Sequence, residues 1–241
     1  MGIPRLRRYS GPAILSYGFR PFFLAGSFYA GLGILIWLPF FFGRLKVPTA
    51  FTALDWHIHE MLYGYLPAVI TGFLLTAIPN WTGRLPLQGK PLAILVFAWL
   101  AGRLAVFFSA DIGAPAAGAI DLLFLVLVAL ATAREIIKGR NWRNLAPVVV
   151  IVLFATGNAI VHFEAYRTGA ANFGIRIGIA AVIALITLIG GRVVPSFTRN
   201  WLSRRHSGTL PAPFGRYDKA SIVVSTLALV LWVAAPGAYA S

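Results

Sequence analysis

The residues most suited to chemistry are two histidines and a glutamate at the start of an apolar stretch. His57, His59 and Glu60 directly precede Met61, which opens an uncharged run that extends to residue 83. Imidazole, carboxylate and thioether groups can all bind metals. Ionisable side chains at the edge of an apolar span are costly, so their presence indicates a functional site. We therefore expect a metal or cofactor site where this segment meets the membrane boundary.

Helix geometry separates the two histidines. Residues two apart lie about 200° apart around a regular helix, so His57 and His59 cannot both ligate one metal and must serve different neighbours. On the same regular helix His57 shares a face with Glu60, Met61 and Gly64, and the glycine leaves space there for a flat group.

A third histidine, His162, is expected at a similar depth on a later span. Two imidazoles from facing helices can supply both axial ligands of a haem in the core of a helix bundle. The remaining histidine would then join a copper or other metal site with Glu60, Met61 or Glu164. The spacing leaves open which histidine does which, and each could instead be an interfacial hydrogen-bonding residue.

Other charged residues are candidates for supporting roles. The second nitrogen of a ligating imidazole is usually held by a carboxylate or carbonyl, and Asp55, Glu60 and Glu164 are close enough in sequence to serve. Arg103, in mid-span, and Arg176, on the outer side, are candidates to bind haem propionates or an anionic substrate. Arg20 more simply reaches lipid headgroups. His206 lies in a basic loop and is not expected to bind a metal.

The composition is that of an integral membrane protein. Hydrophobic residues make up 59% of the 241 residues and charged residues 12%, with a mean hydropathy of +0.78. The alternation of apolar and polar residues that marks barrel strands is absent, so the fold class is all-α. The chain has no cysteine, which excludes disulfides, iron–sulfur clusters and thiolate-ligated or c-type haem.

Seven apolar runs predict seven transmembrane helices in a single domain, residues 1–241. The runs are interrupted only by isolated charges such as Arg103 and Asp121. Most approach the roughly 20 residues that a helix needs to cross a bilayer. The first is too long for a signal peptide and reads as a retained helix. The predicted spans are 21–43, 56–80, 91–110, 113–137, 145–166, 173–197 and 219–240.

Basic residues predict the orientation. The net charge of +14 does not indicate nucleic-acid binding, because the Lys and Arg residues are divided among the loops; fifteen of the 21 fall on one side of the predicted spans. By the positive-inside rule the N-terminus is cytoplasmic and the C-terminus is outside, which puts His57, His59 and His162 near the outer face. The basic side is expected to contact anionic lipid headgroups.

Four motifs carry a family resemblance. They are GFRPFF at 18–23, WHIHEMLYG at 56–64, GFLLTAIPNWTG at 72–83 and the segment from GGR at 190–192 to residue 200. In this order they resemble the NnrS family. The resemblance implies a multi-pass protein of the bacterial inner membrane that contains haem and copper. It also implies a role in nitric oxide metabolism or in resistance to nitrosative stress.

The resemblance also implies site residues. His57 and His59 match the histidines of the second-span motif, and His162 is a further candidate ligand, for haem b or for copper. Nitric oxide is the expected ligand, since this small neutral molecule dissolves in lipid and reaches a site between membrane helices. Family members are usually longer, so we expect a short relative or a fragment. The redox partner, and whether nitric oxide is turned over or only bound, stay open.

Two other functions fit the same residues. In a transporter or channel, His and Glu side chains would line a path for protons or metal ions. Pro67 and Gly72 could break the second span, as in many transporters. Alternatively, the protein serves in assembly or sensing and catalyses no reaction.

Overall fold

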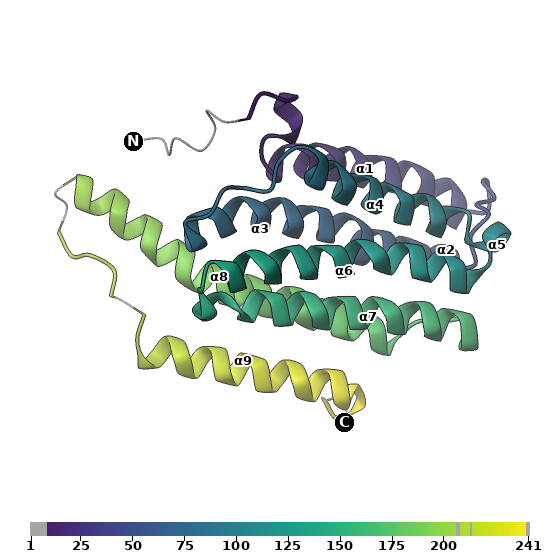
Figure 1. Ribbon diagram of the computed structural model, residues 1–241. Coiled ribbons are helices and arrows are strands. Elements are labelled where there is room, and N and C mark those ends of the chain that lie inside the picture. The colour runs from purple at the N-terminus through teal and green to yellow at the C-terminus, as the bar shows by residue number, and fades with distance from the viewer. Residues whose placement is uncertain (1–8, 206–207, 213, 240–241) are drawn as a thin grey trace. The chain divides into compact units, whose positions relative to one another are not determined.

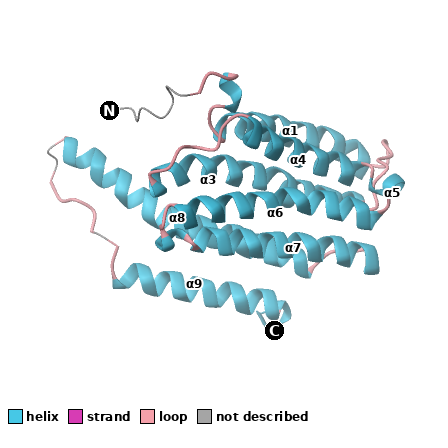
Figure 2. Ribbon diagram, viewed as in Figure 1, coloured by secondary structure: helices cyan, strands magenta, loops and turns pink. Residues whose placement is uncertain are grey.

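The computed structural model describes residues 9–205, 208–212 and 214–239. These residues form helices joined by loops and include no strand, as Figure 2 shows. The predicted all-α fold is therefore confirmed. His206, which is not expected to bind a metal, lies outside the described residues.

Seven helical segments in the described part are long and apolar enough to cross a membrane, which agrees with the seven predicted spans. The second consists of three consecutive elements, α2 (Ala53–His59), η3 (Glu60–Tyr65) and α3 (Leu66–Thr82). The others are α1 (Phe19–Phe41), α4 (Lys90–Phe107), α6 (Ala114–Lys138), α7 (Ala146–Thr168), α8 (Phe173–Arg204) and α9 (Arg216–Ala234).

The chain divides into two compact units, Met1–Gly178 and Ile179–Ser241. In the first unit α1, α3, α4, α6 and α7 run as roughly parallel rods (Figure 1). Helix α6 packs against α3, α4 and α7, and α1 packs against α3. The short helix α5 (Ser109–Ile112) lies where α4 ends and α6 begins. We call this end of the first unit the α5 end.

The second unit contains the rest of α8 and the whole of α9. At the start of α9 the carboxylate of Asp218 accepts the Gly215 N–H at 2.7 Å, which satisfies one free donor of the first turn. No residue of α9 is buried. Its apolar length therefore suits contact with lipid. Near the end of α8 the guanidinium of Arg205 lies 4.2 Å from the centre of the Trp201 ring.

Local sequence explains where the second span begins and ends. The Thr52 hydroxyl accepts the Asp55 N–H at 3.1 Å and caps α2, as its side chain type favours. At the other end Gly83 has a φ of +72°, a left-handed conformation that glycine adopts without strain. The span therefore starts and stops at positions where the sequence supplies a cap.

The middle of this span is not a regular α-helix. Residues Glu60–Tyr65 form a π-helix, in which the Leu66 N–H reaches back five residues to the Met61 carbonyl. Pro67 follows directly; it has no N–H to donate, and its ring would clash with the carbonyl four residues earlier in a regular helix. A wide turn ahead of the proline relieves that clash. It also changes the faces expected for the residues after His59.

Candidate metal centre

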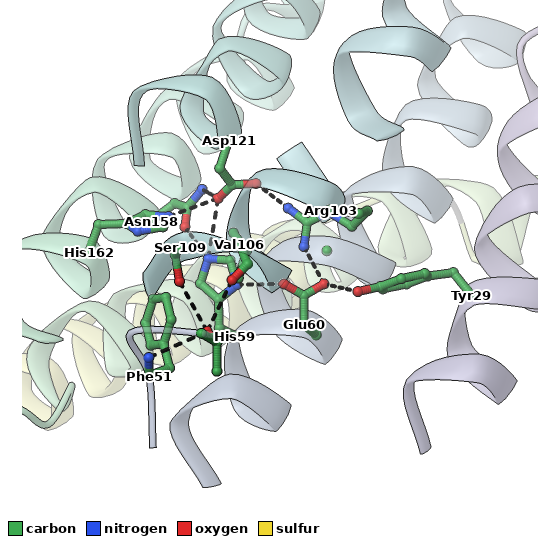
Figure 3. Close-up of polar contacts among 12 residues, drawn as sticks. Tyr29, Phe51, His59, Glu60, Arg103, Val106, Ser109, Asp121, Asn158 and His162 are labelled. Carbon is green, nitrogen blue, oxygen red and sulfur yellow. Dashed lines mark hydrogen bonds and ion pairs between the residues drawn. The ribbon is translucent and has the colours of Figure 1, made fainter. Parts of the chain in front are cut away.

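Three side chains from three helices converge in the first unit. They are His59 at the end of α2, Asp121 on α6 and His162 on α7 (Figure 3). One ligand atom from each lies within 4.8 Å of the other two. Oδ2 of Asp121 is 3.2 Å from Nε2 of His59 and 3.0 Å from Nε2 of His162. Two imidazoles and one carboxylate form a donor set typical of first-row transition metals.

Two of the three side chains are almost fully shielded from solvent, and the third, that of His162, is 10% exposed. His59 is 1% exposed and Asp121 is 2% exposed. The rings of His59 and His162 have centroids 4.9 Å apart and are inclined at 69°. Helix α6 approaches α7 closely because residue 118 is a glycine: a Cβ there would lie 3.1 Å from Cγ of His162. The close approach brings the His162 ring to Asp121, one turn further along α6.

Asn158 connects the cluster. It lies one turn before His162 on the same face of α7. Its Oδ1 atom is 3.0 Å from Nε2 of His59, and its Nδ2 donates to Oδ2 of Asp121 at 2.7 Å. Asn158 is fully buried. Its amide therefore holds an imidazole and a carboxylate together across α2, α6 and α7.

A buried guanidinium joins the cluster to a second carboxylate. Arg103 on α4 donates from Nη1 to Oε2 of Glu60 at 2.6 Å and from Nη2 to Oδ1 of Asp121. Oε1 of Glu60 lies 3.2 Å from Nδ1 of His59. The Tyr29 hydroxyl on α1 donates to Oε2 of Glu60, the same oxygen that accepts from Arg103. Tyr29, Glu60 and Arg103 therefore form the continuous chain of hydrogen bonds seen in Figure 3.

The charges in this network favour a cation. Two carboxylates, Glu60 and Asp121, face one guanidinium, Arg103. Both ring nitrogens of His59 face oxygen atoms, Nδ1 that of Glu60 and Nε2 those of Asp121 and Asn158. The network therefore needs one more positive charge, from a proton on His59 or from a bound cation. A buried charge is costly unless it is paired. A metal cation at His59 and His162 would supply the missing positive charge.

The space beside Gly64 holds the guanidinium of Arg103. A Cβ at Gly64 would overlap Nη1 of Arg103 and would come within 2.8 Å of Oε2 of Glu60. The Gly64 carbonyl accepts the indole N–H of Trp99 at 2.8 Å. Trp99 and Arg103 lie one turn apart on α4. This glycine therefore allows α4 to pack against the π-helix.

Other residues expected at the site lie elsewhere. His57 is half-buried and stacks on Trp37 of α1, with ring centroids 3.9 Å apart and an interplanar angle of 16°. Its Nδ1 has no hydrogen-bond partner among the described residues. Met61 also faces α1, since a Cβ at Gly33 would lie 2.9 Å from its terminal methyl group. The structure thus groups His59 with His162 and leaves His57 and Met61 against α1.

Glu164 and Arg176 also lie outside the cluster. Glu164 accepts backbone N–H groups of Asn172, Phe173 and Gly174 at 3.0–3.1 Å. It therefore satisfies free donors at the start of α8. The Arg176 guanidinium lies 5.7 Å from the centre of the Phe173 ring. Glu164 lies on α7 and Arg176 on α8, on either side of the turn that joins the two helices.

Sequence reasoning missed Asp121, Asn158 and Tyr29 as members of the site. In the sequence Asp121 interrupts an apolar run. A lone carboxylate within a span is itself a signal of function. Asn158 also lies within a predicted span, four residues before His162, so the two could have been placed on one helical face. Tyr29 has no comparable signal in the sequence.

The cluster fits a single metal ion better than a haem. A haem between His59 and His162 would need open space between their Nε2 atoms. Oδ2 of Asp121 lies within 3.2 Å of both atoms. The cavity beside His162 has a volume of about 10 Å³, room for about one water molecule. In this arrangement the pair does not accommodate a porphyrin.

Fold and site define a multi-pass helical membrane protein with a buried His/Asp/His cluster suited to a metal ion. The chain belongs to the NnrS family, whose model, described as NnrS protein, matches residues 13–241. No curated protein and no solved structure matches the chain significantly. Family membership indicates a membrane protein of the nitric oxide response.

Proposed function

We propose that this chain is a bacterial inner-membrane protein that binds a transition metal ion between His59, Asp121 and His162. The ion would serve nitric oxide metabolism or resistance to nitrosative stress. One observation carries the proposal: ligand atoms from three different helices lie within 4.8 Å of one another in a buried position. Separate helices must pack in one specific way to achieve this.

Iron and copper are the metals that fit both this set of protein donors and nitric oxide as the bound molecule. Imidazole suits both, and a pair of histidines with one carboxylate is the ligand set of many non-haem iron centres. The bound ion would supply the position at which nitric oxide binds. The polypeptide contributes a fixed geometry, because Glu60 orients His59 through Nδ1 and Arg103 holds the free oxygen of Asp121.

The surroundings of the cluster suit a neutral ligand. His59 and Asp121 are almost fully buried, and a charged substrate would lose its hydration on entering. Nitric oxide has no charge and dissolves in the bilayer. It would therefore reach the cluster without a polar channel.

We assign the haem expected from the family resemblance to His57. The support is chemical: His57 is the histidine outside the cluster in the described part of the chain, and its Nδ1 has no partner there. Its ring lies on the α1 side of the span, stacked on Trp37. The proposal predicts that a haem absorption band is lost in His57→Ala and kept in His59→Ala.

Metal analysis of purified variants tests the main proposal. The wild-type protein should contain about one iron or copper ion per chain beyond any haem iron, since three protein ligands suffice for a catalytic site. His59→Ala and His162→Ala should lose this ion. His57→Ala is the matched control and should keep it. Equal metal loss in all three variants, or a metal-free wild-type protein, would exclude the assigned site.

The metal-loaded protein should also respond to nitric oxide. Adding the gas should change the electron paramagnetic resonance spectrum of a non-haem iron or copper centre, and His162→Ala should show no such change. An unchanged wild-type spectrum would argue against a role for this centre in nitric oxide chemistry, even if the metal is present.

A proton or metal-ion transporter is the second candidate. The observation in its favour is the interrupted second span, where a π-helix carries Glu60 beside the buried Arg103. Proteoliposomes loaded with a pH-sensitive or metal-sensitive dye would decide between the two functions. Flux that is abolished in Glu60→Gln favours transport, and the absence of flux in metal-loaded protein favours a fixed metal centre.

A further inference from the structure

The metal centre is covered at the α5 end by the segment that links α1 to α2. We call residues 47–52 of this segment the strap. Val47 and Phe51 anchor it and are 8% and 7% exposed. The Phe51 ring lies 5.1 Å from the His59 ring and 5.5 Å from the His162 ring, measured between centroids. One side chain thus covers both imidazoles, and Figure 3 shows it beside His59.

Hydrogen bonds tie the strap to the junction of α4 and α5. The Ala50 N–H donates to Oγ of Ser109 at 2.8 Å, and the Thr49 hydroxyl donates to the Val106 carbonyl at 3.0 Å. The Ala110 N–H donates to the Pro48 carbonyl at 3.0 Å. Ser109 is 1% exposed. Such buried hydrogen bonds resist local opening, so the strap is a fixed part of the site.

A small cavity remains beside the Phe51 ring. Its lining includes Phe51, Ser109, His162 and Tyr166, and its volume is about 10 Å³. This is room for about one water-sized molecule. A diatomic molecule has a similar width, whereas a planar ring such as imidazole does not fit. The cavity touches a proposed metal ligand directly, since His162 forms part of its wall.

We propose that Phe51 is the specificity-determining residue of the metal centre and admits only ligands about as narrow as nitric oxide. The inference rests on the proposed function, because it concerns which molecules reach His59 and His162. The ring excludes water and larger ligands on the α5 side. The cavity beside it is the route by which a small neutral molecule approaches His162.

Chemical labelling of the metal-free protein tests the cover directly. Diethyl pyrocarbonate modifies accessible neutral imidazoles, and mass spectrometry resolves the peptides that contain His57, His59 and His162. In Phe51→Ala the labelling rate of His162 should rise at least about tenfold, because loss of the ring uncovers an imidazole that is only 10% exposed in the wild type. The rate at His57, which stacks on Trp37, should stay unchanged and reports whether the fold is intact.

Three further variants distinguish the effect of losing the Phe51 ring from a general loosening of the packing around it. Phe51→Leu fills most of the same space and should label slowly, like the wild type. Ser109→Ala keeps the ring but removes the acceptor of the Ala50 N–H, so it should raise the His162 rate by less than Phe51→Ala. Phe108→Ala removes an exposed aromatic ring near the same junction and should have no effect. Equal rates at His162 in Phe51→Ala and wild type would overturn the inference.

Ligand size is tested on the metal-loaded protein with two probes. Nitric oxide should change the spectrum of both wild type and Phe51→Ala. Imidazole should change it only in Phe51→Ala, and binding of imidazole to the wild type would overturn the size filter. Absence of metal from the wild type would count against the proposed function alone, since the labelling experiment still decides whether Phe51 covers the histidines.

Discussion

Oδ2 of Asp121 on α6 lies 3.0 Å from Nε2 of His162 on α7, in a buried position between two membrane-spanning helices. Its other oxygen, Oδ1, accepts a hydrogen bond from Arg103 on α4. One carboxylate thus connects the histidine cluster to the buried guanidinium.

Asp121→Asn should weaken metal binding strongly. The amide retains the size of the side chain but removes the negative charge, and its neutral oxygen is a weaker ligand than a carboxylate. Arg103 keeps Glu60 as a partner in this variant, so the free energy of unfolding should fall by about 1–3 kcal/mol, less than for a buried charge left with no partner. Metal content and thermal unfolding in detergent measure the two effects. Asp111→Asn, which changes an exposed aspartate, should alter neither.

Arg103→Leu should destabilise the protein more than any single carboxylate substitution, because it leaves Glu60 and Asp121 buried without a cation. We expect a loss of about 3–5 kcal/mol in the free energy of unfolding. Adding Glu60→Gln and Asp121→Asn to this variant should restore part of the loss, since all three charges are then gone. The control is Arg134→Leu, at a position whose side chain is 58% exposed. If the triple variant is less stable than Arg103→Leu, charge is not the cause.

Gly64→Ala should displace the guanidinium from its position against the π-helix. The added methyl group overlaps Nη1 of Arg103, and such overpacking costs about 1–3 kcal/mol. Metal affinity should fall as well, because Arg103 positions Asp121. In Gly31→Ala on α1 the new methyl group meets no atom within 4 Å, so this control should differ from wild type by less than about 0.5 kcal/mol. Equal stability of the two variants would contradict the close contact.

Glu164→Ala should lower stability without affecting the metal. Its carboxylate accepts three backbone N–H groups at the start of α8, and loss of such a cap costs about 0.5–2 kcal/mol. Glu164→Gln keeps an acceptor oxygen and should lose less. Loss of metal in both variants, with stability unchanged, would instead place Glu164 at the metal centre, as the sequence alone suggested.

The sequence was sufficient to predict the class of fold. Apolar length is a property of each segment by itself, and a chain in lipid must satisfy its backbone hydrogen bonds within helices. The capped start of α2 at Thr52 was also predictable, because capping depends on residues within one turn. The same local reasoning identified His59, His162 and Arg103 as unusual residues for an apolar environment.

Local reasoning did not find how these residues pair. The expected faces of the second span assumed a regular helix, and the π-helix at Glu60–Tyr65 places Gly64 against Arg103. Glu164 seemed near enough in sequence to support a histidine, yet it caps α8. Asp121 is 41 residues from His162 and 18 from Arg103. Such pairs form only when α4, α6 and α7 pack side by side.

The sequence by itself therefore determined a seven-span helical membrane protein and the residue types available for metal chemistry. The tertiary structure alone decided that His59, Asp121 and His162 meet and that His57 faces α1. The physical reason is the range of the interactions. Hydropathy, capping and turn formation act over a few neighbouring residues, whereas a ligand set from three helices depends on which helix faces touch, and glycines such as Gly64 and Gly118 set how closely.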